Sequence, residues 1–297
     1  MRYKVTHRTA YRYNYPVSVG NHLACLRPRA LATQRLESFT LNLSPVPGEV
    51  IEREDYYGNT LHLFSIQEPH RDLVVEAQSE VEVLATTPTY GSSVRWEEAA
   101  ALLPQDHSTS GLDAYQFRFE SPRIRLRSEF AGYARQSLTP ARPLREGLLE
   151  LTDRLHREFR FQPNATSVST TVDEVFARRR GVCQDFAQMQ IAMLRSLGLA
   201  ARYVSGYLRT TPPPGQERLV GADASHAWIS VYCPGEGWLD LDPTNNVVPG
   251  TDHITVSWGR DFSDVSPLRG LILGGGVQAL KVGVDVEELP ALATAAP

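Results

Sequence analysis

The 297-residue chain contains few cysteines and no long apolar run. Its three cysteines, Cys25, Cys183 and Cys233, are too few and odd in number for a disulfide framework, so we predict a reducing, cytoplasmic location. No stretch has the apolar length needed to span a bilayer, and the polar N-terminal residues lack the apolar core of a signal peptide. We therefore expect no membrane partner.

An excess of one charge is also missing, because 30 Lys and Arg residues face 34 Asp and Glu residues and the formal net charge is −4. This balance gives no electrostatic reason to expect a nucleic-acid partner. Several catalytic signatures are absent as well, namely G-x-S-x-G, a Walker loop, H-E-x-x-H and C-x-x-C. Without an EF-hand pattern or an acidic loop cluster, we expect neither a metal nor a cofactor.

The pattern of apolar residues changes near residue 93. Before it, short alternating runs such as 39–43 and 61–66 are separated by turn sequences, which is typical of a β-sandwich-like module. After it, the spacing predicts helices and then strands, with a loop at 105–111. The predicted helices cover 94–103, 122–138, 143–159, 171–180 and 183–197, and the predicted strands 201–208, 226–233, 238–242, 254–258 and 278–286. We predict an α+β fold with a β-rich module at 1–110 and a second domain of helices and strands at 111–297.

Cys183 begins the strongest predicted helix. Gly181, two residues earlier, can adopt backbone angles that a side chain would forbid, so a tight turn places Cys183 in the first helical turn. The unpaired N–H groups and the positive dipole end there stabilise a thiolate and can hold an oxyanion. We expect Asp185 to cap this helix. The alternative is a buried, inert cysteine, the interpretation that we keep for Cys25 and Cys233.

His226 begins a predicted strand, and carboxylates follow on the next strand across a P-G-E-G turn. An imidazole that acts as a base needs one nitrogen facing the thiol and the other held by an acceptor. Asp242 is our candidate acceptor, and Asp240 on the same strand face is the weaker one. The alternative is that His226, one of eight histidines, is structural.

Strand pairing decides whether Asp242 can reach His226. A plain four-residue loop would place the two on opposite faces of the hairpin. If Tyr232 instead pairs with Trp238, Asp242 lies opposite Trp228 and diagonal to His226, about 7–8 Å away between Cα atoms. We predict this second register, through a five-residue loop or a β-bulge.

Four segments resemble, in order, the bacterial transglutaminase-like cysteine proteins. They are R-G-V-C-Q-D-F-A, A-R-Y-V-S-G-Y-L, D-A-S-H-A-W and G-W-L-D-L-D-P-T. The order Cys–His–Asp at these intervals matches the compact transglutaminase core, from about residue 143 to about residue 246. The opening R-Y-K-V-T-H-R-T-A-Y-R-Y, followed by R-P-R, resembles the N-terminal β-region that accompanies this core.

The resemblance implies a papain-like, transglutaminase-like core in which the helix bearing the cysteine packs on an antiparallel sheet. It also implies a catalytic triad of Cys183, His226 and Asp242, the residues that strand and helix patterns select independently. Three further residues match family positions and are expected to be structural or to line the cleft: Tyr207, Asp223 and Trp228. Gln184 is a candidate oxyanion donor, the alternative being a solvent-facing helix residue.

A triad of this kind predicts an acyltransferase that acts on peptide or glutamine-type amides through a thioester. Resolution by water would make the protein a peptidase or amidase, that is, a hydrolase of the cysteine protease type. Resolution by an amine would make it a transglutaminase, and the sequence does not separate the two. The expected partners are a peptide or protein substrate and, for transfer, an amine acceptor. The alternative function is a non-catalytic scaffold or a peptide-binding protein.

Overall fold

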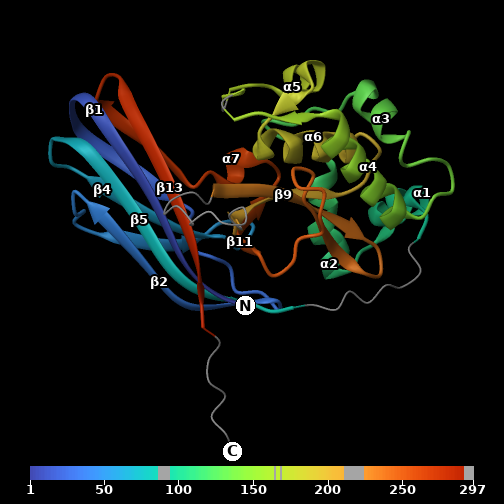
Figure 1. Cartoon of the computed structure of the whole chain (residues 1–297), viewed down its shortest axis with the longest axis horizontal. Helices are drawn as coiled ribbons and strands as arrows, with labels where there is room; N and C mark the ends of the chain where they lie inside the picture. The colour runs from blue at the N-terminus through green and yellow to red at the C-terminus, as the bar shows by residue number, and fades with distance from the viewer. Residues whose placement is uncertain (86–93, 164, 168, 211–223, 291–297) are drawn as a thin grey trace, which may run out of the picture.

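The computed structural model describes residues 1–85, 94–163, 165–167, 169–210 and 224–290, which form two lobes (Figure 1). One lobe consists of strands, and the other carries the helices around a smaller sheet. This arrangement confirms the predicted α+β class. None of the described helices is long and apolar enough to cross a membrane.

The β-rich lobe is a single seven-stranded antiparallel sheet that bends over itself. Its strands are β1 Arg2–Ala24, β2 Gln34–Ser44, β3 Val50–Glu54, β4 Thr60–Ile66, β5 His70–Val83, β12 Leu268–Gly274 and β13 Gln278–Leu289. The first half of β1 pairs with β5 and β13, and its second half pairs with β4 and β12. The register with β5 shifts between Arg12 and Val17. Residues Tyr13, Phe64 and Leu73 of three strands then meet in one core, as in a sandwich.

The division into lobes differs from the predicted boundary between 1–110 and 111–297. Strands β12 and β13 return from the end of the chain to pair with β1, so residues 268–289 belong to the β-rich lobe. At the other end, Ala99 packs into the core of the helical lobe. The backbone groups along one edge of β1 pair with strands from the far end of the chain. Local sequence patterns do not reveal which distant strand pairs with which edge. The structure also contains β3 and β12, which were not predicted.

The helical lobe surrounds a four-stranded sheet in the order β10-β9-β8-β11. Its strands are β8 Ala201–Leu208, β9 Ala224–Cys233, β10 Gly237–Leu241 and β11 His253–Gly259, with a two-residue pair of β6 Arg160–Phe161 and β7 Arg180–Gly181. Its helices are α1 Trp96–Leu102, α2 Thr109–Tyr115, α3 Ser128–Ala134, α4 Leu144–Glu158, α5 Val172–Arg178, α6 Cys183–Arg195 and α7 Phe262–Val265. The predicted loop at 105–111 is wrong where α2 begins, since Ser108 caps that helix by accepting from the N–H of Gly111. The predicted helix at 122–138 is shorter and covers only α3.

Helix α6 lies at the centre of this lobe. Residues 185–195 are all buried, because α3, α4 and α5 cover the helix on the side away from β8 and β9. Two of its buried polar side chains have hydrogen-bond partners inside the lobe. The Gln190 amide donates to the Thr152 hydroxyl at 2.8 Å, and the Arg195 guanidinium donates to the carbonyl of Ala201 at 2.8 Å. The helix is thus fixed in the lobe core. It ends at Arg195, two residues before the predicted end, and Gly198 follows with φ of +79°.

The β-rich lobe completes the free edge of β11. The Gln34 amide both donates to and accepts from the backbone of Thr255, at 2.8 Å each. The Asn59 amide does the same for Trp258, at 2.8 and 3.0 Å. These side chains replace the backbone of a missing neighbouring strand. The lobe that precedes the helices in sequence therefore holds one strand of the second sheet in place.

Candidate active site

The segment before Cys183 is anchored from two sides. Strand β7 pairs in parallel with β6, and the N–H of Gln162 donates to the carbonyl of Gly181 at 2.9 Å. A Cβ atom on Gly181 would lie 2.7 Å from Oδ2 of Asp185, so glycine is required here for space. This corrects the reason given by the sequence, because the φ angle of Gly181 is not in the left-handed region.

Asp185 caps α6, as predicted. Its Oδ2 accepts from the N–H of Val182 at 2.8 Å and from the Thr166 hydroxyl at 2.6 Å. Burial raises the pKa of the Asp185 carboxyl, and these two hydrogen bonds oppose the rise. The N–H groups of Cys183 and Gln184 have no acceptor among the described residues, as expected for a first helical turn, and are available to an incoming oxyanion.

The β9–β10 hairpin has the register that brings acid and histidine together. Tyr232 pairs with Trp238, as predicted, but the predicted five-residue loop or β-bulge is wrong. The pairing continues without a shift to Cys233 and Gly237, so only residues 234–236 close the turn. Asp242 directly follows β10. Its Oδ2 lies 2.7 Å from Nε2 of His226, near the start of β9.

Asp242 is fully buried and accepts from several donors. Its Oδ1 accepts the N–H groups of Thr244 and Asn245, at 2.9 and 3.1 Å. Its Oδ2 accepts from His226, from the Asn245 amide at 2.7 Å and from Nε2 of His253 at 3.2 Å. Burial alone would raise the pKa of this carboxyl, but the hydrogen bonds from the two histidines and Asn245 hold it well below its ordinary value. Asp242 is therefore an ionised carboxylate at neutral pH.

His226 lies between this carboxylate and the cysteine. Burial lowers the pKa of its ring, but hydrogen bonds to Asp242 and to the Cys183 thiol, together with the charges of both, raise it to about 9. Since Nε2 is held by Asp242, Nδ1 is the nitrogen that serves the sulfur. The fold thus brings the three predicted residues into one chain of contacts, and it favours an imidazolium in the middle.

The structure places three of the four remaining predicted site residues. Tyr207 points toward the β-rich lobe, where its hydroxyl lies 3.1 Å from Nδ1 of His7, so it joins the lobes and does not line the site. Trp228 is fully buried beneath the site, and its Nε1 donates to Asp240 at 3.4 Å. Gln184 is half-buried beside Cys183, and its side chain has no hydrogen-bond partner among the described residues. Asp223 lies outside the described residues.

The other two cysteines do not share this environment. Cys25 and Cys233 are both buried, at 3% exposure each. Burial is the main cause that raises the pKa of the Cys25 thiol to about 11 and that of the Cys233 thiol to about 12. Cys183, by contrast, is partly exposed.

Two known protein families match segments of this chain. Residues 3–82 match the bacterial transglutaminase-like N-terminal region, and residues 131–243 match the transglutaminase-like superfamily core. An uncharacterized protein of Mycobacterium tuberculosis is 41% identical over 295 residues, which is 96% of this chain and 92% of the relative. The chain belongs to the transglutaminase-like superfamily.

Two further proteins are similar to this superfamily member at lower sequence identity. A protein-glutamine gamma-glutamyltransferase of Pseudomonas aeruginosa is 32% identical over 157 residues, or 50% of this chain and 23% of that enzyme. A crystal structure from Cytophaga hutchinsonii, of a protein assigned provisionally to the cysteine proteases, superposes with a TM-score of 0.75 at 18% identity and covers 98% of this chain and 92% of its own. The latter shows a shared fold.

Sequence reasoning missed three residues around this transglutaminase-like site. They are Thr166, Asn245 and His253, which contact Asp185 or Asp242. Asn245 follows the motif that contains Asp242 and could have been found by extending that motif. No local pattern singles out Thr166 or His253, because each reaches the site only through the tertiary fold.

His226, Asp242 and His253 also form a group whose ligand atoms all lie within 4.8 Å of one another, close enough to hold a metal ion. The separations of 2.7 and 3.2 Å between each histidine nitrogen and Oδ2 are hydrogen-bond lengths, with a proton between the atoms. A metal here would displace the proton that His226 holds. The arrangement therefore favours proton chemistry over metal chemistry.

Proposed function

We propose that this protein is a cysteine-dependent acyl-transfer enzyme that acts on peptide or glutamine-type amides through a thioester. The observation that carries the proposal is the His226 ring, whose Nε2 lies 2.7 Å from the buried Asp242 carboxylate and whose pKa is raised in part by Cys183 at the start of α6. Such an arrangement suits an ion pair of thiolate and imidazolium, the two groups that open an amide.

The proposed first step forms the thioester. The Cys183 sulfur attacks the amide carbonyl carbon, and the carbonyl electron pair moves to oxygen, where the N–H groups of Cys183 and Gln184 can donate to it. As the oxyanion collapses, the carbon–nitrogen bond breaks and Nδ1 of His226 gives its proton to the departing nitrogen. Ammonia or an amine leaves. Asp242 keeps the ring oriented throughout by accepting from Nε2.

The proposed second step releases the acyl group. His226, now neutral, takes a proton from water or from an amine, which attacks the thioester and restores the thiolate. Water yields a hydrolase, and an amine yields a transglutaminase. The named activities of the Pseudomonas relative and of the Cytophaga protein represent these two outcomes, and we extend to this chain only their shared chemistry.

We also propose a peptide or protein as the substrate, with no nucleic-acid or membrane partner. The three cysteines are unpaired, which is consistent with the reducing cytoplasm that we propose as the location.

The proposal is tested by incubating a library of glutamine-containing peptides with the wild type and with Cys183→Ala, each with and without a small primary amine. Hydrolysis of a side-chain amide adds about 1 Da, crosslinking to lysine removes about 17 Da, and amine transfer adds the amine less about 17 Da. Backbone cleavage gives two fragments instead. We expect one of these products from the wild type alone. A product formed equally by Cys183→Ala, or no product together with equally slow alkylation of all three cysteines, would contradict the proposal.

A further inference from the structure

His253 is a second histidine on the proposed catalytic carboxylate. It is the first residue of β11, it is 8% exposed, and its Nε2 lies 3.2 Å from Oδ2 of Asp242. Because an ionised carboxylate only accepts, Nε2 of His253 must carry a proton. Its Nδ1 is buried without a hydrogen-bond partner among the described residues. Among the described residues, the ring of His253 therefore has one hydrogen-bond partner, Asp242, to which Nε2–H donates.

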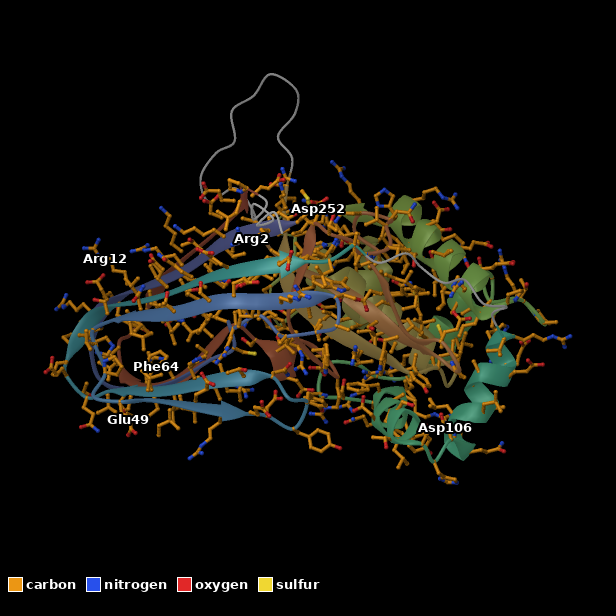
Figure 2. All side chains as sticks on the ribbon, turned by 90° about the horizontal axis from the view of Figure 1, so that it is seen from below. Arg2, Arg12, Glu49, Phe64, Asp106 and Asp252 are labelled. Carbon is orange, nitrogen blue, oxygen red and sulfur yellow. The ribbon has the colours of Figure 1, made fainter. Side chains whose placement is uncertain are left out.

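Packing and the β-rich lobe hold this ring in place. The ring of Trp228 meets it edge-on, with the centroids 5.3 Å apart and an interplanar angle of 84°. The preceding residue, Asp252, accepts from the Tyr3 hydroxyl of β1 at 3.0 Å and lies where the two lobes meet (Figure 2). Further along β11, Gln34 pairs with the backbone of Thr255. His253 is thus presented to Asp242 by a strand that the other lobe fixes.

We infer that His253 is a positioning residue for the proposed triad, whose N–H donation keeps the buried Asp242 carboxylate ionised and aimed at His226. The inference rests on the proposed function. Complete burial disfavours a charged carboxylate, and each N–H that it accepts offsets part of that cost. Without His253, Oδ2 would keep only His226 and the Asn245 amide as donors.

Other titratable groups near Asp242 and His253 already interact with partners of their own. Cys183 acts on His226, where it helps to raise the pKa of the ring. Asp240 of β10 accepts a hydrogen bond from Nε1 of Trp228 rather than from His226 or His253. Asp252 is paired with Tyr3 and with Arg209, whose Nη1 lies 3.6 Å from its Oδ1. On the side of α4, His156 bonds the carbonyl of Thr244 at 2.8 Å through Nδ1. A change at His253 should therefore be transmitted chiefly through Asp242.

Three variants separate a positioning role from a structural one. His253→Phe keeps a ring and removes the donor. His253→Gln places an amide N–H near the position of Nε2, and His253→Asn carries the same amide one methylene too short to reach Asp242. His70→Phe is a matched control, because His70 is equally buried, at 7% exposure, within the β-rich lobe.

The readout is the rate of Cys183 alkylation by iodoacetamide across pH, with the modified residue identified by peptide mapping. With one N–H donor fewer, Asp242 is protonated more easily, and it then stabilises the His226 imidazolium less. A less populated imidazolium in turn stabilises the Cys183 thiolate less. We expect the acid limb of the profile to move up by about half to one pH unit in His253→Phe and His253→Asn. His253→Gln and His70→Phe should stay near the wild type.

Superimposable profiles of folded His253→Asn and His253→Gln would overturn the inference, as would a shift in His70→Phe equal to that in His253→Phe. Failure of the proposed function looks different. In that case wild-type Cys183 would be alkylated no faster than Cys25 and Cys233, whatever residue stood at 253.

Discussion

Replacing Asp242 by asparagine should remove the charge that keeps His226 protonated. The amide of Asp242→Asn has nearly the shape of the carboxylate, so Oδ1 can still accept from the N–H groups of Thr244 and Asn245. The change therefore removes the negative charge and replaces Oδ2, the acceptor for His226, Asn245 and His253, by an NH2 group. It affects the one group whose raised pKa depends on Asp242, the imidazole of His226.

The magnitude follows from that pKa. The pKa of His226 is raised from 6.5 to about 9, and its side chain is only 7% exposed, so solvent screens the interaction little. A difference of about 2.5 pH units corresponds to about 3 kcal/mol. In Asp242→Asn we expect the pKa to fall to about 6.5 or lower, because burial then opposes the charge with only Cys183 to support it. At pH 7.5 the protonated fraction should fall from about 97% to about 9%.

The assay is a pH titration of the histidine Cε1 signals in 13C-labelled protein, with the His226 signal assigned from His226→Gln. Alkylation of Cys183 at pH 7.5 gives a second readout, which we expect to slow by about tenfold in proportion to the imidazolium fraction. A titration midpoint within one pH unit of the wild type would refute the reasoning.

Stability should respond in a defined pH window. The folded-state pKa of His226 is raised, so protonation of His226 stabilises the wild type fully below about pH 6.5, and this contribution is lost as pH rises through about 9. The difference in unfolding free energy between wild type and Asp242→Asn should shrink across that window. Denaturant titrations at pH 6.5 and 9 measure it, and an equal difference at both values would count against the assignment.

Two glycine substitutions test how the fold builds the site. In Gly206→Ala the new Cβ would lie 2.1 Å from a backbone oxygen of β11 and 2.5 Å from the ring of Trp228, so we expect a loss of about 1–3 kcal/mol or more in denaturant unfolding. Gly132 is a helical position with open space, so Gly132→Ala should not lower the free energy of unfolding. Equal losses in the two variants would show that crowding is not the cause. In Gly181→Ala the new Cβ crowds Asp185, so the helix cap should weaken by about 0.5–2 kcal/mol and Cys183 alkylation should slow; an unchanged alkylation rate would separate the cap from reactivity.

Much of the helical lobe could be predicted because its signals are local. Helix α6 begins at Cys183 and ends before Gly198, where the sequence predicts both limits, since capping residues and apolar spacing act within a few turns. The hairpin register was predictable for a similar reason. Side chains alternate along a strand, and only the pairing of Tyr232 with Trp238 lets Asp242 reach His226.

The sequence by itself determined the family and the three residues that meet at the candidate site, because motif order and strand alternation are properties of neighbouring residues. Only the tertiary structure decided that β12 and β13 return to pair with β1 and that His253 becomes a third donor on Oδ2 of Asp242. Both depend on contacts between segments far apart in the chain. Their energy comes from satisfying strand edges and buried polar groups, and no local pattern records which distant partner does so.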